Sequence, residues 1–361
     1  MVTEISPTPC RLLRILLTAD PELPVPPLGY GGIERIVDAL VRGFRAQGHT
    51  VGLVAHPDST AAANCRFSWP GRNSRGLANT LKNMMALRGA VRSFKPDVVH
   101  SFSRLNYLLP LLPGRLPKLM SYQRHTGGRQ VKLASSLAGP SLGFTGCSEY
   151  IAAMGRKSGG TWQAIHNFVE IEKFTFSAVV APDAPLVFLS RIDSIKGADT
   201  AIAIARATGR RLIIAGNHAT SGPEANYWRE KIDPELGKND IEWFGEVGDT
   251  AKNGLLGGAA ALVVPIRWDE PFGIVFAEAL ACGTPVITCQ RGALDEIVTH
   301  GQNGFFISTV ADGVAAVSRL GEIDRRECRR TAENKFTASV AVSAYLALYR
   351  TMIANNQPGS S

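Results

Sequence analysis

Short apolar segments alternate along the chain with longer segments that have a helical spacing of apolar residues. The helix predicted at 33–47, for example, has its apolar residues at 33, 36, 37, 40, 41 and 44, which places them on one face. Short apolar strands with helices between them are typical of a parallel sheet covered on both faces. In the first half, strands are predicted at 12–18, 50–55, 97–101 and 118–122, and helices at 33–47 and 76–94.

The same alternation restarts in the second half, after an interruption at about 170–184. We therefore predict an α/β protein with two doubly wound, Rossmann-like parallel-sheet domains facing each other across a cleft. Strands are predicted at 185–191, 211–215, 241–244, 261–265 and 285–288, and helices at 198–208 and 335–355. The expected divisions are an N-terminal domain at 1–170, a linker at 171–184, a C-terminal domain at 185–334, and a final helix at 335–361 that crosses back to the first domain.

Composition describes a folded protein without a membrane span. Of the 361 residues 45% are hydrophobic and 19% are charged, and no apolar run approaches the roughly 20 residues of a transmembrane helix. The first residues do not form a convincing signal peptide, so a cytoplasmic location is expected. The six cysteines include no C-x-x-C pair, which argues against a disulfide framework and against a zinc site.

Charge is unevenly distributed. Residues 1–165 carry 20 Lys and Arg against 8 Asp and Glu, whereas the remainder carries 19 against 23. The basic half is expected to meet an anionic partner. Nucleic acid is not expected, because this half lacks the interleaved aromatic residues of a base-stacking surface.

The segment DEPFGIVFAEALACG, at 269–283, follows a predicted strand and opens a helix near Gly273. Free N–H groups at a helix N-terminus bind anions, and Gly273 lets a ligand approach the backbone. The carboxylates of Glu270 and Glu278 can accept hydrogen bonds from neighbouring sugar hydroxyls. The alternative for each glutamate is a helix-capping or solvated side chain.

Two cations in FLSRIDSIKG, Arg191 and Lys196, follow a predicted strand and precede a helix. Fixed positive charges can stabilise the diphosphate that leaves a nucleotide sugar. The sequence contains no D-x-D triplet to hold a metal ion, so neither a metal nor another cofactor is expected. The alternative is a solvated surface pair.

The segment from Glu270 to Glu278 resembles the E-x7-E motif of the retaining glycosyltransferases of family four, the group 1 enzymes with a GT-B fold. The resemblance implies that Glu270 contacts the donor sugar and Glu278 the ribose. It also implies that Arg191 and Lys196 are the family's diphosphate-binding pair, although Ser190 stands where the family usually has glycine. The backbone that would hold sugar and phosphate is that of Phe272, Gly273, Ile274 and Val275.

Other parts of the family's donor site are matched more loosely. Gly31 and Gly32 resemble its glycine-rich loop, and His125 the histidine that contacts the donor sugar, with Arg124 as the competing candidate and a structural role as the alternative. A stretch that includes Val247, Asp249 and Lys252 resembles the loop with which the family recognises the nucleobase. This stretch fits guanosine and uridine donors alike. Residues 166–170 resemble the family's stretch near the interdomain link, and we assign them no chemistry.

The helix predicted at 76–94 has two interpretations. Family members that act on lipid-linked acceptors use a basic, amphipathic surface of the N-domain to touch anionic membranes. The alternative is a helix whose apolar residues face the core and whose outer face is solvated. Its basic residues are Lys82, Arg88, Arg92 and Lys95, and its apolar residues are Leu77, Leu81, Met84, Met85, Leu87 and Val91.

The function predicted on these grounds is retaining transfer of a hexosyl group from a UDP- or GDP-sugar to a sugar, lipid-linked or small-molecule acceptor held by the N-domain. N-domain loops such as 57–76 and 126–143 are expected to build the acceptor site. Two other functions are compatible with the fold: a non-hydrolysing nucleotide-sugar epimerase, and a catalytically idle protein that binds a sugar nucleotide.

Overall fold

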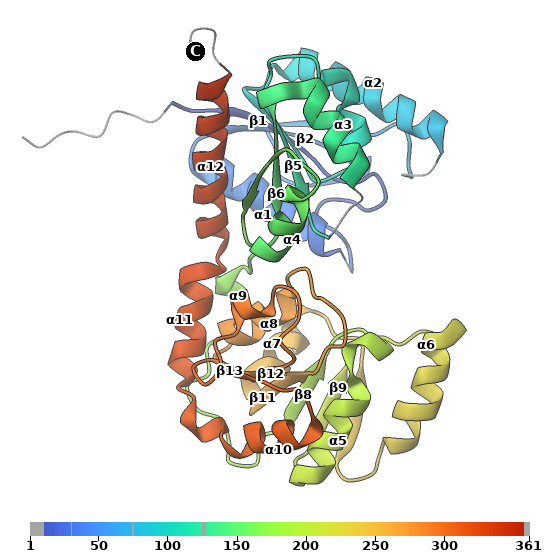
Figure 1. Cartoon of the computed structure of the whole chain (residues 1–361), viewed down its shortest axis with the longest axis vertical. Coiled ribbons are helices and arrows are strands. Elements are labelled where there is room, and N and C mark those ends of the chain that lie inside the picture. The colour runs from blue at the N-terminus through green and yellow to red at the C-terminus, as the bar shows by residue number, and fades with distance from the viewer. Residues whose placement is uncertain (1–10, 30, 74–75, 125–127, 357–361) are drawn as a thin grey trace, which may run out of the picture. The chain divides into compact units, whose positions relative to one another are not determined.

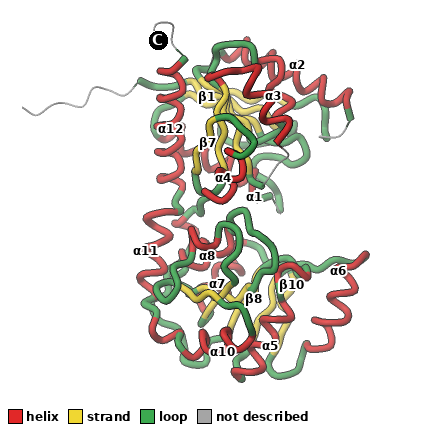
Figure 2. Tube along the Cα trace, viewed as in Figure 1, coloured by secondary structure: helices red, strands yellow, loops and turns green. Residues whose placement is uncertain are grey.

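The computed structural model describes residues 11–29, 31–73, 76–124 and 128–356. The chain forms two compact units, each built on its own parallel sheet (Figures 1 and 2). The N-terminal unit contains the described residues within 1–146, 152–164 and 342–361, and the C-terminal unit contains 147–151 and 165–341. Residues 147–151 and the predicted linker at 171–184 thus belong to the C-terminal unit.

The N-terminal unit has a seven-stranded parallel sheet in the order β3-β2-β1-β4-β5-β6-β7. The strand order reverses between β1 and β4, as in other doubly wound sheets. The strands are β1 (Arg14–Thr18), β2 (Thr50–Ala55), β3 (Cys65–Ser68), β4 (Val98–Ser101), β5 (Lys118–Tyr122), β6 (Leu142–Gly146) and β7 (Thr161–Ala164). The α-helices with residues in this unit are α1 (Gly32–Ala46), α2 (Leu77–Phe94), α3 (Gly128–Ala138), α4 (Glu149–Arg156) and α12 (Ala338–Asn355).

The C-terminal unit has a six-stranded parallel sheet in the order β10-β9-β8-β11-β12-β13. The prediction of two doubly wound domains is therefore confirmed. The strands are β8 (Leu186–Leu189), β9 (Leu212–Ala215), β10 (Ile241–Gly245), β11 (Ala261–Val264), β12 (Val286–Thr288) and β13 (Gly304–Phe306). The α-helices are α5 (Ala198–Thr208), α6 (Gly222–Tyr227), α7 (Asp249–Gly258), α8 (Ile274–Ala281), α9 (Leu294–Ile297), α10 (Val310–Ser318) and α11 (Arg325–Lys335).

The last helix, predicted at about 335–355, is present as α12 but begins three residues later, because the chain leaves helical geometry at Phe336 and Thr337. The Phe336 carbonyl accepts a hydrogen bond from the N–H of Val169, and Thr337 forms a β-bridge with the same residue. The Thr337 hydroxyl accepts the N–H of Val340, one of the free donors at the start of the next helix. Two helices result, α11 and α12.

Helix α2 has a buried face, as the core-facing alternative expects, but not all of its apolar residues lie on it. Its buried residues are Asn83, Leu87, Ala90 and Phe94. Leu77, Leu81 and Met85 are 76%, 51% and 60% exposed, so these three apolar residues point to solvent. None of the helices in the described part of the chain is long and apolar enough to cross a membrane.

A buried polar network attaches α12 to the sheet of the N-terminal unit. The ring of His100 on β4 hydrogen-bonds through Nδ1 with the Tyr349 hydroxyl, at 2.5 Å, and through Nε2 with the Ser121 hydroxyl, at 2.6 Å. Ser121 continues the network to Thr145 on β6. Burial lowers the pKa of His100 to about 3, so the ring stays neutral at physiological pH.

This network predicts acid sensitivity. Between pH 6.5 and about 3 the unfolded chain protonates His100 and the folded chain does not. The free energy of unfolding should therefore fall as the pH drops through this range, with a His100 contribution of about 1.4 kcal/mol per pH unit. Urea denaturation at several pH values should show a shallower pH dependence for His100→Asn than for the wild type. Equal slopes would contradict the assignment.

Candidate functional site

The predicted donor segment has the expected geometry of strand, loop and helix N-terminus. Strand β11 ends at Val264, and α8 begins at Ile274 with Gly273 as its N-cap. Gly273 has φ +87°, and a Cβ there would lie 2.5 Å from the Phe276 ring. Glycine is required at this turn. The N–H groups of the first turn of α8 lack helical partners, so they are able to bind an anion.

Glu270 and Lys196, which are 74 positions apart in sequence, form an ion pair of 2.6 Å between Oε2 and Nζ. Both side chains are largely buried, at 12% and 13% exposure. The Trp268 indole N–H donates to the same carboxylate oxygen at 2.9 Å, and the Lys196 ammonium lies 4.7 Å from the centre of the Trp268 ring. The two predicted catalytic groups are thus held together by hydrogen bonds and a cation–π contact.

A second ion pair joins two predicted donor-binding residues. Lys252 on α7 contacts Glu278 on α8, with 2.5 Å between Nζ and Oε1. Asp249 lies 3.5 Å from the same ammonium group. The predicted ribose-binding and base-reading residues therefore lie side by side.

The remaining predicted donor residues lie outside these two ion pairs. Arg191 is half exposed and pairs with Asp193, at 2.8 Å. The Phe272 side chain is buried, so only its backbone can face a ligand, whereas Ile274 and Val275 are partly exposed, as is Val247. Gly31 and Gly32 lie at the start of α1 in the N-terminal unit, where Gly31 is the N-cap. His125 lies outside the described residues.

The structure adds anchoring residues that the sequence did not indicate. The Ser148 hydroxyl donates to the Pro271 carbonyl at 2.6 Å, and the Ala293 N–H donates to the Glu270 carbonyl at 2.8 Å. Gly292 has φ +62°, and a Cβ on it would lie 2.3 and 2.4 Å from the backbone O and N of Glu270. The backbone of the donor loop is thus fixed by residues from two other segments.

Glu296 holds the segment that carries Ser148. Its carboxylate accepts the N–H groups of Glu149 and Tyr150, at 2.7 and 2.8 Å, and pairs with His166 Nε2 at 2.7 Å. Burial acts to raise the pKa of Glu296, but these hydrogen bonds outweigh it, and the pKa is lowered. Glu296 therefore stays ionised and caps the start of α4.

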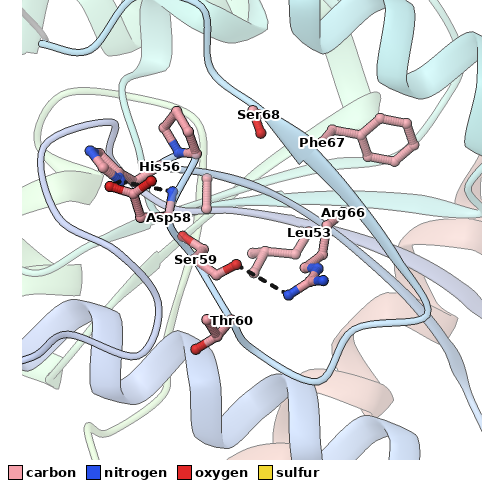
Figure 3. Close-up of a pocket in the computed structure, with 10 residues that line it drawn as sticks. Leu53, His56, Asp58, Ser59, Thr60, Arg66, Phe67 and Ser68 are labelled. Atoms are coloured by element: carbon pink, nitrogen blue, oxygen red, sulfur yellow. Dashed lines mark hydrogen bonds and ion pairs between the residues drawn. The ribbon is translucent and has the colours of Figure 1, made fainter.

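The loop after β2 in the N-terminal unit borders a hollow of about 480 Å³ (Figure 3). The Arg66 guanidinium donates to the Ser59 carbonyl, and His56 Nδ1 accepts the N–H of Asp58. Part of the loop predicted to build the acceptor site, at 57–60 and 66–68, lines this hollow. Its role in acceptor binding stays a prediction.

Within the part of the chain that the structure describes, no three His, Cys, Asp or Glu residues are grouped closely enough to hold a metal ion. The five described cysteines are unpaired: Cys65, Cys147, Cys282, Cys289 and Cys328.

Nearly the whole chain is similar to known proteins. The family model described as Glycosyl transferases group 1 matches residues 171–336, and that described as Glycosyltransferase Family 4 matches residues 30–173. Glycogen synthase of Mycobacterium tuberculosis strain H37Rv is 26% identical, over 90% of this chain and 93% of that protein.

Solved structures show the same architecture. AviGT4, a glycosyltransferase involved in avilamycin A biosynthesis, has a TM-score of 0.70 and 25% identity, over 95% of this chain and 98% of its own. HepE from Anabaena, solved with UDP-glucose, has a TM-score of 0.71 and 16% identity, over 94% of this chain and 100% of its own. The GT-B fold is thereby confirmed.

Gly292→Ala should weaken donor binding at least about tenfold, because its Cβ would push the Glu270 backbone out of place. The matched control is Gly209→Ala, at φ +64° with no atom within 4 Å of the added Cβ. That variant should cost about 1–2 kcal/mol of stability, from the left-handed conformation alone, and leave donor affinity unchanged. Titration calorimetry with the nucleotide sugar measures the donor affinity of both variants. Equal affinities in the two variants would contradict the role of Gly292.

Proposed function

Because the chain belongs to the group 1 glycosyltransferases, we propose that it transfers a hexosyl group from a UDP- or GDP-sugar to an acceptor held by its N-terminal unit, with retention of configuration and without a metal ion. Membership of this family makes the chain a hexosyltransferase that uses nucleotide-sugar donors. The nucleobase, stereochemistry, metal independence and acceptor are parts of the proposal. The Lys196–Glu270 pair beside the N-terminus of α8 is the observation that carries it.

Lys196 is suited to stabilise the leaving diphosphate. Negative charge grows on the phosphate oxygens as the sugar departs, and a preorganised ammonium group in a partly dry site stabilises this charge more than water does. The Lys196 side chain is 13% exposed and is oriented by Glu270 and Trp268. The first N–H groups of α8 add donors for the same oxygens. In this proposal these groups, with Arg191, take the place of a metal ion.

Glu270 is suited to position the sugar. Its carboxylate accepts hydrogen bonds from Lys196 and Trp268 through Oε2. Carboxylate oxygens accept several hydrogen bonds, so Oε1 is available for a sugar hydroxyl while Oε2 keeps its partners. The support for retention is the resemblance of Glu270 and Glu278 to the family motif.

The nucleobase is proposed to be read beside Lys252 and Asp249, while Glu278 accepts from the ribose hydroxyls. The Lys252 contact orients Glu278 for that task. HepE, which has the same fold, was solved with UDP-glucose, and this supports testing uridine donors first.

Lys196→Ala and Glu270→Ala should each lower kcat/KM at least about 100-fold, because each removes a group proposed to act on the transition state. Lys238→Ala, an exposed lysine of the same unit, is the control and should keep full turnover. A coupled assay that detects the released nucleoside diphosphate measures all three. Wild-type turnover in the Lys196 variant would exclude the proposed mechanism.

Two further measurements test retention of configuration and independence of metal ions. NMR of the product should show the anomeric configuration of the donor, and EDTA should leave the rate unchanged. An inverted product or loss of activity in EDTA would refute those two parts. An altered nucleotide sugar formed without any acceptor would indicate an epimerase, and donor binding without transfer or hydrolysis would indicate an idle binding protein.

We also propose that the N-terminal unit contacts anionic membrane through α2 and α3. The solvent face of α2 has Leu77, Leu81 and Met85 in its first half, followed by Arg88 and Arg92. An apolar stripe next to basic residues fits a surface of anionic lipid headgroups. On α3, the exposed residues Leu133 and Leu137 follow Arg129 and Lys132.

Vesicles with anionic lipid should bind the protein at low salt and release it at high salt. Replacing Lys82, Arg88 and Arg92 by glutamine should abolish this binding. The control carries the same loss of charge on the C-terminal unit, at the exposed Arg229, Lys231 and Lys238, and should bind like the wild type. Co-sedimentation measures the bound fraction, and equal binding of both triple variants would refute a specific surface.

A further inference from the structure

Asp20 lies where a doubly wound sheet is expected to bind its ligand. It follows β1 by two residues, at the carboxyl end of the strand. Strand order reverses between β1 and β4, and ligands of such sheets bind at the carboxyl ends of the strands at this reversal. Hydroxyl groups of Thr18, Ser101 and Ser103 hydrogen-bond with one another across these two strands, at 2.8–3.0 Å.

Oδ1 of Asp20 is buried and has no hydrogen-bond partner among the described residues. The neighbouring hydroxyl groups are already engaged with one another. A buried oxygen without a partner costs roughly 1–3 kcal/mol, so its retention in a folded protein requires an explanation. A ligand that donates a hydrogen bond would remove this cost.

Several charged or titratable groups surround Asp20. Burial raises its pKa to about 6, nearby Glu22 and Glu34 add to the increase, and the guanidinium groups of Arg104 and Arg124 oppose it. Tyr107 also interacts electrostatically with this carboxyl, whose charge helps to raise the pKa of the phenol. Glu34, in the first turn of α1, is itself buried, and burial raises its pKa. Near pH 8 the Asp20 carboxylate is ionised, and it then accepts hydrogen bonds but cannot donate them.

We propose that Asp20 Oδ1 binds a hydroxyl group of the acceptor, which makes the carboxyl end of β1 and β4 the subsite for a polyhydroxylated acceptor such as a sugar or cyclitol. This rests on the proposed transfer reaction, with the acceptor held by the N-terminal unit. A hydroxyl fits because it donates to the carboxylate, whereas an ionised phosphate offers no donor. Arg104 and Arg124, close enough to stabilise the ionised carboxylate, keep Asp20 in the form that binds it.

The test is Asp20→Asn, with Asp183→Asn as the matched control. Asp183 is an exposed aspartate of the C-terminal unit, just before β8. A panel of free hexoses, disaccharides and cyclitols is assayed as acceptors with the best nucleotide sugar. Asp20→Asn should raise the acceptor KM at least about tenfold at pH 8 and leave the donor Kd unchanged. The two proteins should converge as the pH falls below 6, where wild-type Asp20 becomes protonated.

Thermal unfolding gives a second readout, which tests whether the Asp20 carboxylate lacks a stabilising partner in the folded protein. Wild-type folding disfavours the charged Asp20, because its folded pKa is raised above the unfolded value of 3.8. This loss of stability is complete above pH 6 and absent below pH 3.8. Asp20→Asn should therefore have a higher Tm than the wild type at pH 8 and the same Tm at pH 3.8. A lower Tm at pH 8 would overturn the proposal.

Saturation-transfer NMR with the same sugars and cyclitols separates this inference from the proposed reaction. If the wild type binds these compounds and Asp20→Asn does not, the subsite is supported. If the wild type binds them but no transfer is detected, the proposed reaction is refuted and the subsite still stands. If both proteins bind them equally, or if the acceptor KM is unchanged, the subsite is refuted while the transferase proposal stands.

Discussion

The loop at 269–273, which is proposed to bind the donor, has its backbone fixed by contacts with other segments. The carbonyl of Glu270 accepts from Ala293, the carbonyl of Pro271 accepts from Ser148, and Gly292 packs directly against the backbone of Glu270. A loop fixed on several sides presents its carboxylate and the following helix N-terminus in one geometry. Preorganisation of this kind lets charged groups act on a reaction without the cost of rearranging them.

The main charged groups of this site form ion pairs. Lys196 with Glu270, and Lys252 with Glu278, each place opposite charges in partly buried positions, where a lone charge would be costly. Each pair combines a cation suited to phosphate or base with a carboxylate suited to hydroxyl groups. A nucleotide sugar offers both kinds of group, so it can replace some of the contacts within each pair without leaving a buried charge unpaired.

Much of the fold follows from periodicity, because buried parallel strands are short and apolar and their covering helices are amphipathic. The strand predicted at 118–122 and the helix at 198–208 have the bounds that the structure gives them. Periodicity does not reveal which face of a helix is buried. On α2 the polar Asn83 is inside, bonded to Gly71 and Tyr107, while Leu81 is outside, and no local pattern distinguishes that arrangement from its opposite.

The site was predictable in pieces rather than as an arrangement. Glu270 and Lys196 each stand in a local motif, but their ion pair depends on how β8 and β11 lie in the sheet. Ser148 and Glu296 had no such motif, since their roles arise from tertiary contacts with the donor loop and α4. Asp20 follows a strand in an unremarkable sequence context, and only its missing partner makes it noticeable.

The attachment of α12 to the N-terminal unit affects the order in which the protein is made. His100 and Ser121 are synthesised early, but Tyr349, which covers them, leaves the ribosome after the entire C-terminal unit. The N-terminal unit therefore cannot complete its core during most of translation, whereas residues 165–341 are complete before it. Until α12 has been synthesised, the nascent chain exposes this side of the sheet to chaperones and proteases. The C-terminal unit can then fold before the N-terminal unit is complete, which is the reverse of the usual order.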